Sequence, residues 1–535
     1  MRFSPRTLRW SVGVLSLSLI GLVWVAELPR VTLRFVYSPD AEGVLAPMIA
    51  RFNAEHLFVT IEGESGSSGA ELRKIVDGED RPDLWMPASQ IWVKLLNLDM
   101  GEQVTLPEPP SYFWSPELIA TWKHVKEALG GQVGFQDLAA LAADDNLLGG
   151  AEFRLGHTRP TTSTSGLFAV VSEYEAALGG RALDPQAMRE PEVTAAVRAV
   201  EATVRHYDDI AGDFCEPLSS FTSTYVTAVY LQETTLEKCL AAAEGLDELV
   251  GVVPPGGTYI ADYPLVRFAW STDGARAAAA REAAAVFERW LAEHLDPDAI
   301  GAQHLHVGDP WDPATANDDP PPDLRRQHPD AVVLKAAQDG WHEARKPGHV
   351  LLVLDRSAGM SEQGHDVAAR NLLREILGQL PTRDQDQVGF MTFGVEVSLV
   401  QPLAPVADVR DELKEDIEAA RPTESTSAVL YDALWEVTQL PALLDQTAID
   451  LVVIVSLGVD VGSAQRRESL IRRIELRRSA PSALQIVTVS SDDPGSGELL
   501  GEIADASYSP TYVLTNAEDG PTSAADIAKA IAKLV

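Results

Sequence analysis

The sequence is poor in cysteine and in positive charge. Its 535 residues include two cysteines, and 43 lysines and arginines stand against 79 aspartates and glutamates. Without a Cys-x-x-Cys pair or a cluster of histidines, the common zinc modules are excluded. A formal net charge of −36 argues against nucleic acid and anionic lipid surfaces as partners. Cys215 and Cys239 either form one disulfide or stay as separate buried thiols.

Catalytic signatures are also missing. The chain has no Gly-x-Ser-x-Gly turn, and no close-set histidine and aspartate would activate a serine. A hydrolase is therefore the weakest function that we consider. We expect a protein that binds and does not catalyse.

One long apolar run lies at the amino terminus, from Trp10 to Ala26. Three arginines precede it, which predicts a cytoplasmic tail over residues 1–9 and a transmembrane signal anchor over residues 10–26. A cleaved signal peptide is the alternative, although a cut after Ala26 would place Trp24 where a small residue is needed. By either route, we expect the bulk of the chain in the periplasm or outside the cell.

In the first large region, residues 31–310, predicted strands and helices alternate and two hydroxyl-rich loops precede helices. Glu64–Gly69 leads into a predicted helix over residues 70–77, and Gly156–Gly166 leads into one over residues 167–177. Such a loop presents backbone N–H groups and hydroxyls at the positive end of a helix, where an anion or carboxylate is stabilised. A plain serine cap is the alternative.

This order of elements resembles the type II periplasmic solute-binding proteins that serve import transporters. The stretches Gly66–Gly69, Pro87–Ser89 and His157–Gly166 carry the resemblance. It implies two α/β lobes hinged around a cleft, with the chain crossing between them near Gly156 and again near residues 222–229.

By that resemblance, hydroxyl-bearing residues would line the cleft and take a small uncharged or anionic ligand without a cation. The ligand-binding residues it implies are Ser67, Ser68, Ser89, Thr164, Ser165 and Tyr263. A lobe pair kept as a scaffold without a ligand is the alternative.

Residues 311–345 are predicted to be a linker and a connecting helix. The stretch up to residue 323 is rich in proline and acid, as in a stiff, solvated spacer. The pattern from Val332 to Arg345 then indicates a helix, which Pro347 ends.

The second large region, residues 346–535, opens with a run of apolar residues that ends in Asp355. Such a run predicts a strand buried on both faces, and the alternation of strands and helices after it predicts a doubly wound parallel sheet. The motif Asp355-Arg-Ser357-Ala-Gly359 resembles the opening of a von Willebrand factor A domain, and Asp386–Phe393 and Leu430–Leu434 extend the likeness.

That family holds Mg²⁺ between three loops, and this sequence departs from its pattern. Asp355 and Ser357 match the first loop, but Gly359 replaces a serine. Thr426 would serve only if its loop were longer than usual, and Leu457 replaces an aspartate. The resemblance thus implies a degenerate metal site of Asp355, Ser357 and Thr426, in which Mg²⁺ binding is doubtful.

Taken together, the sequence predicts a membrane-anchored extracytoplasmic binding protein. A small ligand or envelope component would bind in the two-lobe cleft, and a protein partner would bind the A-type domain. The alternative is the substrate-binding receptor of an import transporter.

Overall fold

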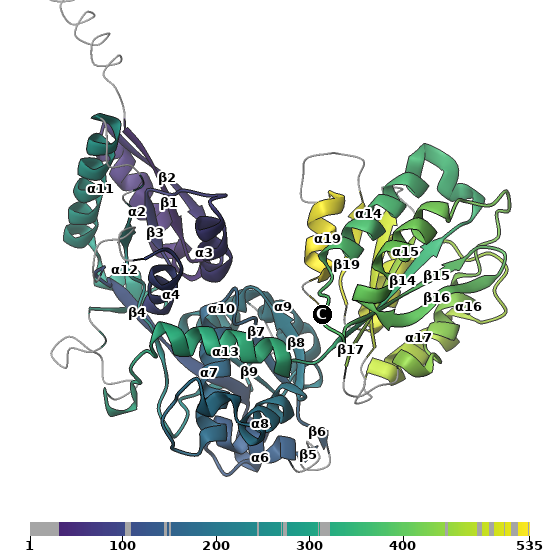
Figure 1. The fold of residues 1–535 in the computed structure, drawn as a ribbon, viewed down its shortest axis with the longest axis horizontal. Helices are drawn as coiled ribbons and strands as arrows, with labels where there is room; N and C mark the ends of the chain where they lie inside the picture. The colour runs from purple at the N-terminus through teal and green to yellow at the C-terminus, as the bar shows by residue number, and fades with distance from the viewer. Residues whose placement is uncertain are drawn as a thin grey trace, which may run out of the picture. The chain divides into compact units, whose positions relative to one another are not determined.

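The structure, a computed structural model, describes residues 31–101, 109–143, 147–148, 151–242, 246–268, 270, 275–308, 310, 322–443, 448–478, 484–491, 497–507, 509–514, 523–532 and 534 (Figure 1). The predicted tail, the transmembrane segment and most of the proline-rich spacer lie outside these residues. Within the described ranges, no helix has the length and apolar character needed to cross a bilayer.

The chain divides into two compact units. One holds the residues up to Pro116 together with Ile260–Ala331, and the other holds Glu117–Tyr259 together with Val332–Val535. The division therefore falls within β4 (Phe113–Trp122) and between Tyr259 and Ile260. Our prediction of crossings near Gly156 and residues 222–229 was wrong, because those segments include β7 (Leu155–Thr158) and β9 (Ala228–Gln232), which pair with each other inside one sheet.

The first unit is built on a four-stranded sheet in the order β12–β3–β1–β2. β1 (Val31–Tyr37), β2 (Val59–Ser65) and β3 (Leu84–Met86) are parallel, and β12 (Val266–Arg267) is antiparallel. Its helices include α2 (Glu42–Glu55), α3 (Ser68–Asp77), α4 (Gln90–Met100), α11 (Ala275–His294) and α12 (Pro297–Gly301). The aromatic rings of Phe35 and Phe52 both meet Phe287 edge-on in the core, so α11 packs on β1 and α2.

The second unit begins with the sheet β10–β4–β9–β7–β8. Its strands are the second half of β4, β7, β8 (Val204–Asp208), β9 and β10 (Leu249–Val252). The helices around it are α5 (Lys123–Ala128), α6 (Phe135–Ala143), α7 (Thr164–Leu178), α8 (Pro191–Glu201), α9 (Cys215–Phe221) and α10 (Glu233–Ala242). A disulfide joins Cys215 to Cys239, which decides between the two alternatives that the sequence left open.

The predicted connecting helix, α13 (Ala331–Ala344), packs against this sheet region. The Gln338 side-chain amide donates to the Pro160 carbonyl at 2.9 Å, and the Trp341 ring meets the Tyr207 ring edge-on at 5.4 Å. At Gly340, a Cβ atom would lie 2.0 Å from the Tyr174 hydroxyl oxygen of α7. The absence of a side chain at Gly340 thus allows α13 and α7 to approach closely.

The last region, from residue 348, is a six-stranded sheet in the order β16–β15–β14–β17–β18–β19. Its strands are β14 (Gly348–Asp355), β15 (Gln387–Phe393), β16 (Val397–Pro405), β17 (Ile449–Ser456), β18 (Leu484–Ser491) and β19 (Thr511–Leu514), and all pairs are parallel except β15 with β16. Helices α14 (His365–Gln379), α15 (Val406–Ala419) and α19 (Ala524–Ala532) lie on one face, and α16 (Leu430–Val437) and α17 (Arg467–Arg478) lie on the other (Figure 1). α18 (Gly497–Ala506) packs against α17. The α/β class predicted from the sequence is confirmed. Asp355 ends β14, next to the point where the strand order reverses and where such sheets place ligands.

Candidate functional site

Three of the predicted ligand-binding residues gather around Ala88 in the first unit. The Ala88 N–H donates to the Ser68 hydroxyl at 3.0 Å, and the Ala88 carbonyl accepts from the Tyr263 N–H at 3.2 Å. Ser89 follows directly and begins α4 as its N-cap. All three side chains are buried, and the loop between β3 and α4 is held between the start of α3 and the segment before β12.

Asp262 is the centre of this cluster, and the sequence analysis did not single it out. Its carboxylate accepts from the Ser89 hydroxyl at 3.0 Å, from the Gln90 N–H at 2.8 Å and from the Ser111 hydroxyl at 3.3 Å. The residue is 4% exposed. A negative charge therefore already lies at the amino-terminal end of α4, where the helix dipole would otherwise favour an anion. The sequence signal that could have identified Asp262 is that it is an acidic residue next to Tyr263 in an otherwise apolar segment.

The start of α3 is similar. Ser67 is the N-cap and is half-buried, while Glu71 in the first turn is buried. The Glu71 carboxylate lies against Gly66, since a Cβ there would be 2.5 Å from its Oε1, and it pairs with Lys74 at 2.7 Å. The starts of α3 and α4 in this unit thus each carry a carboxylate of the chain itself.

Tyr263 has an unusual backbone. Its φ of +35° is sparsely populated for any residue but glycine, and its ring is fully buried, 5.0 Å from the Phe113 ring. Such a conformation persists only where the surroundings hold it, here through the Ala88 hydrogen bond and the core. The ring packs in the core of the first unit.

Thr164 and Ser165 belong to the second unit, where they open α7 after the N-cap Ser163. Both are buried, and the Ser165 hydroxyl has no hydrogen-bond partner among the described residues. A Cβ at Gly166 would lie 2.0 Å from the Thr158 carbonyl oxygen, so this glycine allows the first turn of α7 to press against the end of β7. The hydroxyl-rich loop is thus a tight strand-to-helix turn.

The predicted metal residue Asp355 is 2% exposed at the end of β14. Its Oδ1 accepts from the Ser357 N–H at 2.8 Å, and its Oδ2 accepts from the Ser456 hydroxyl at 2.8 Å. Burial raises the pKa of Asp355 above its usual range, and these hydrogen bonds only partly oppose that effect. Both oxygens of the carboxylate are therefore engaged with the chain itself.

The other residues of this site do not fit a hard cation. A Cβ at Gly359 would lie 2.8 Å from Leu457 Cδ1, so the leucine side chain occupies the space that a serine at 359 would need. Thr426 is exposed, and it is the Ser425 carbonyl that contacts the first loop, accepting the Ala358 N–H at 2.7 Å. Mg²⁺ requires six oxygens in a near-octahedral array, and an apolar methyl group cannot replace one.

Asp460, the nearest acid after Leu457, has a different role. Its carboxylate accepts from the Tyr431 N–H at 2.9 Å and from the Ser463 hydroxyl at 2.6 Å. It caps the amino-terminal end of α16, and its contacts with Tyr431 and Ser463 account for its position.

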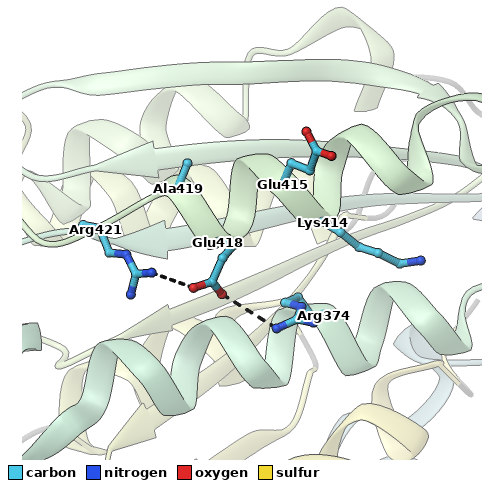
Figure 2. A pocket seen from close by; sticks show the side chains of 6 residues that line it. All are labelled: Arg374, Lys414, Glu415, Glu418, Ala419 and Arg421. Atoms are coloured by element: carbon cyan, nitrogen blue, oxygen red, sulfur yellow. Dashed lines mark hydrogen bonds and ion pairs between the residues drawn. The ribbon is translucent and has the colours of Figure 1, made fainter.

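A surface pocket of about 720 Å³ lies elsewhere in this region, between α14 and α15 (Figure 2). Its charges largely neutralise one another, because Glu418 pairs with Arg421 at 2.6 Å and with Arg374 at 3.7 Å. Ala419 contributes the apolar part of the lining. The pocket does not include Asp355, and its paired charges give no ligand chemistry of their own.

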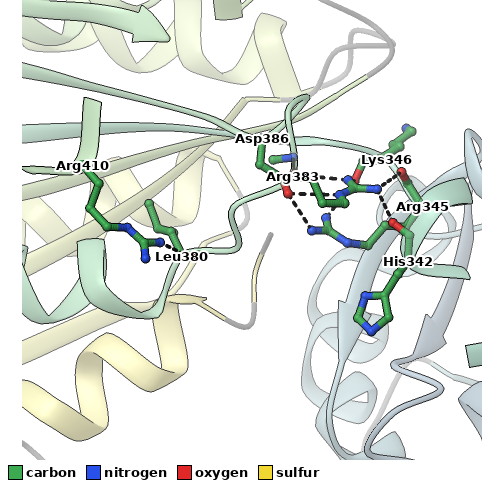
Figure 3. A network of polar contacts seen from close by, with 8 residues as sticks. His342, Arg345, Lys346, Leu380, Arg383, Asp386 and Arg410 are labelled. Carbon is green, nitrogen blue, oxygen red and sulfur yellow. Dashed lines mark hydrogen bonds and ion pairs between the residues drawn. The ribbon is translucent and has the colours of Figure 1, made fainter. Parts of the chain in front are cut away.

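A buried ion pair joins the end of α13 to the last region (Figure 3). Arg345 donates to Asp386 Oδ2 at 3.0 Å, and Arg383 donates to both oxygens of the same carboxylate at 3.1 and 3.2 Å. The Gly348 N–H adds a bond to Oδ1 at 2.8 Å. Arg383 also donates a hydrogen bond to the His342 carbonyl of α13. Together these bonds hold the end of α13 to the turn that precedes β15.

Comparisons with known proteins support the first of the two resemblances in the sequence. Residues 33–294 match the family model described as bacterial extracellular solute-binding protein. The sulfate-binding protein SubI from Mycobacterium tuberculosis is a similar solved structure, with 16% identity over 59% of this chain and 97% of that chain and a TM-score of 0.39. A periplasmic thiamin binding protein has 12% identity over 59% and 96%, with a TM-score of 0.42.

For the last region, a von Willebrand factor type A protein from Catenulispora acidiphila has 15% identity over 35% of this chain and 42% of that chain, with a TM-score of 0.29. No curated protein matches the chain. Because these TM-scores are all below 0.5, the strand orders described above, and not the scores, define the architecture.

Proposed function

We propose, from the solute-binding domain at residues 33–294, that this chain is an extracytoplasmic binding protein that takes a small ligand in its first region and a protein partner on its last. The family match is the observation that carries the proposal, because it spans the segments from which both lobes are built. The disulfide between Cys215 and Cys239 supports an exported location, since such bonds persist in oxidising compartments. Residues 10–26 would supply the anchor.

The ligand of the first region is uncharged or cationic. Asp262 at the start of α4 and Glu71 at the start of α3 already occupy the two helix ends of the first unit that an oxyanion could use. A second negative charge there would meet the Asp262 carboxylate, which is itself buried. We therefore revise the ligand class expected from the sequence, which included anions.

A thermal-shift screen of the full chain tests this. Sulfate, glucose and thiamin serve as anionic, neutral and cationic probes, and we expect no rise in melting temperature with sulfate. Asp262→Asn should weaken a cationic ligand and leave a neutral one unchanged, whereas Asp77→Asn, an exposed position on α3, should change neither. Stabilisation of the unaltered chain by millimolar sulfate would contradict the assignment, and no response to a wide set of small molecules would favour the scaffold alternative.

The last region would bind its partner without a cation. Leu457 fills the space beside Gly359, and the neighbouring Val459 and Val461 are 50% and 45% exposed, which suits an apolar contact. We expect Mg²⁺ to produce the same small change in melting temperature in the unaltered chain and in Asp355→Asn.

A gain-of-function variant completes the test. Gly359→Ser combined with Leu457→Asp would supply one hydroxyl and one carboxylate beside Asp355, and should create a rise in melting temperature that depends on Mg²⁺. If Mg²⁺ stabilised the unaltered chain but not Asp355→Asn, the site would be intact and the proposal for a cation-free surface would be wrong.

A further inference from the structure

Three buried acid–base side chains converge inside the second unit, away from every residue discussed as a ligand-binding or Mg²⁺-binding candidate. His157 lies on β7, Glu173 on α7, and Glu201 is the last residue of α8 (Figure 1). None is more than 1% exposed. His157 Nε2 lies 3.3 Å from Glu201 Oε1 and 4.0 Å from Glu173 Oε1, and one ligand atom from each residue lies within 4.8 Å of the others.

Four of these side-chain atoms have no hydrogen bond within the described part of the chain, although His157 Nε2 lies at ion-pair distance from both carboxylates. Among the described residues, neither oxygen of Glu173, nor Glu201 Oε1, nor His157 Nε2 has a hydrogen bond. A carboxylate removed from water without a donor is strongly unfavourable, and two of them side by side repel each other. A proton or a metal cation held between the carboxylates would relieve this repulsion.

The atoms that do have partners orient the cluster. His157 Nδ1 donates to the Thr158 carbonyl at 2.8 Å, which leaves the lone pair of a neutral ring on Nε2. The Tyr207 hydroxyl donates to Glu201 Oε2, which leaves Oε1 for another ligand. Metal-binding histidines and carboxylates in proteins are commonly held in this way, by a second hydrogen bond on the atom that does not touch the metal.

We propose that His157, Glu173 and Glu201 bind a divalent transition-metal cation, of which Zn²⁺ is the representative. Two carboxylates and a neutral imidazole balance its charge, and an imidazole nitrogen favours a transition metal over Mg²⁺ or Ca²⁺. Metal–ligand distances near 2.1 Å place tetrahedral ligand atoms about 3.4 Å apart. The 3.3 Å separation already fits, and the 4.0 Å one needs a contraction of about half an ångström.

The site is structural, because its ligands are closed off from solvent and come from three elements that the ion would fasten together. Tyr207, which orients Glu201, also packs against Trp341 of α13. The ion would thus stabilise the sheet region on which the connecting helix rests, and it would enter during folding.

Elemental analysis of the full chain, purified without metal-affinity resin or chelator, tests the proposal. We expect about one equivalent of zinc or another first-row metal per chain, and less than a tenth of an equivalent in Glu173→Gln. Glu192→Gln, an exposed carboxylate on the same helix as Glu201, is the matched control and should keep the full equivalent. Tyr207→Phe should bind the metal about 10- to 100-fold more weakly, as loss of an orienting hydrogen bond does elsewhere.

A refolding experiment guards against a variant that fails to fold. The unaltered chain is unfolded in urea with EDTA and refolded with Zn²⁺ or with EDTA, and we expect a higher melting temperature in Zn²⁺. The proposal is overturned if no metal is found and Zn²⁺ has no effect on refolding. A second result would also overturn the proposal: the purified chain holds no metal, and Glu173→Gln raises its melting temperature. That result would mean that a proton, and not a metal ion, lies between the two carboxylates.

Discussion

The buried ion pair at the end of α13 allows the sharpest prediction about stability. Arg345 and Asp386 have side chains that are 5% and 2% exposed, and Asp386 accepts hydrogen bonds from Arg345, Arg383 and the Gly348 N–H (Figure 3). Asp386→Asn keeps the size of the side chain but removes its charge. Arg345 would then remain buried without a counter-ion, because Asp386 is the carboxylate with which it pairs.

Breaking a buried pair from one side costs about 3 to 5 kcal/mol of unfolding free energy. For a region of this size, 1 kcal/mol shifts the melting temperature by about 2 to 4 °C, so Asp386→Asn should lower it by roughly 6 to 20 °C. Asp411→Asn is the control, because Asp411 pairs with Lys414 at 3.0 Å but is 95% exposed. An exposed pair of this kind contributes less than about 1 kcal/mol.

The pH dependence gives a second readout. Burial alone would raise the pKa of Asp386, but the Arg383 hydrogen bonds and the Arg345 charge outweigh it and hold that pKa below its ordinary value of 3.8. A carboxylate whose pKa is lower in the folded than in the unfolded state stabilises the protein above the unfolded pKa, and this contribution is lost as the pH falls through the folded value. The difference between the unaltered chain and Asp386→Asn should therefore be constant from pH 8 to about pH 5 and shrink only below pH 4.

Calorimetric or denaturant unfolding of both variants provides the measurement. If Asp386→Asn and Asp411→Asn lowered the free energy of unfolding by the same amount within about 0.5 kcal/mol, burial would not determine how strongly this ion pair stabilises the protein. The reasoning would also be refuted if the difference in stability between the unaltered chain and Asp386→Asn already became smaller near pH 6, because that would require a raised pKa for Asp386.

Two further predictions concern the second unit. The disulfide between Cys215 and Cys239, 24 residues apart, should stabilise the protein by about 3.5 kcal/mol by lowering the entropy of the unfolded chain. A reductant should therefore lower the melting temperature of the unaltered protein but not of the variant with both cysteines changed to alanine. Two free thiols in denatured protein that has not been reduced would contradict this. Gly340→Ala should destabilise by about 1 to 3 kcal/mol despite its better helix propensity, because its Cβ would meet the Tyr174 hydroxyl at 2.0 Å. Gly378→Ala, with open space around it in α14, should instead raise the free energy of unfolding by up to about 1 kcal/mol. If denaturant unfolding showed that both variants stabilise the protein, or that both destabilise it, the close contact at Gly340 would be ruled out as the cause.

The strands were predictable because their signal is local. The run from Val350 to Leu354 is apolar at every position, which only a strand covered on both faces requires, and β14 is buried throughout. The division of the first region was not predictable in the same way. β4 carries ten buried residues without a break, and nothing local in it marks the place where one compact unit ends and the other begins.

The candidate sites show the same difference. Ser68 and Ser89 could be proposed from the sequence because a hydroxyl before a helix is a local pattern. Asp262 was missed because its partners at 89 and 111 are distant in sequence, and no spacing rule connects them. His157, Glu173 and Glu201 are separated by 16 and 28 residues, and only the packing of β7, α7 and α8 brings them together.

The site at Asp355 shows what a departure from a pattern means once the contacts are known. In the sequence, Gly359 and Leu457 are two independent losses in two loops. In the structure they are one contact, because the leucine side chain occupies the volume that a serine at 359 would need. Gly359→Ser alone would force the Leu457 side chain to move. Leu457→Asp alone would put a second carboxylate beside the buried Asp355, with too few ligands present to hold a cation between the two. Each single reversal is therefore unfavourable, and the two residues should show strong coupling in a double-mutant cycle.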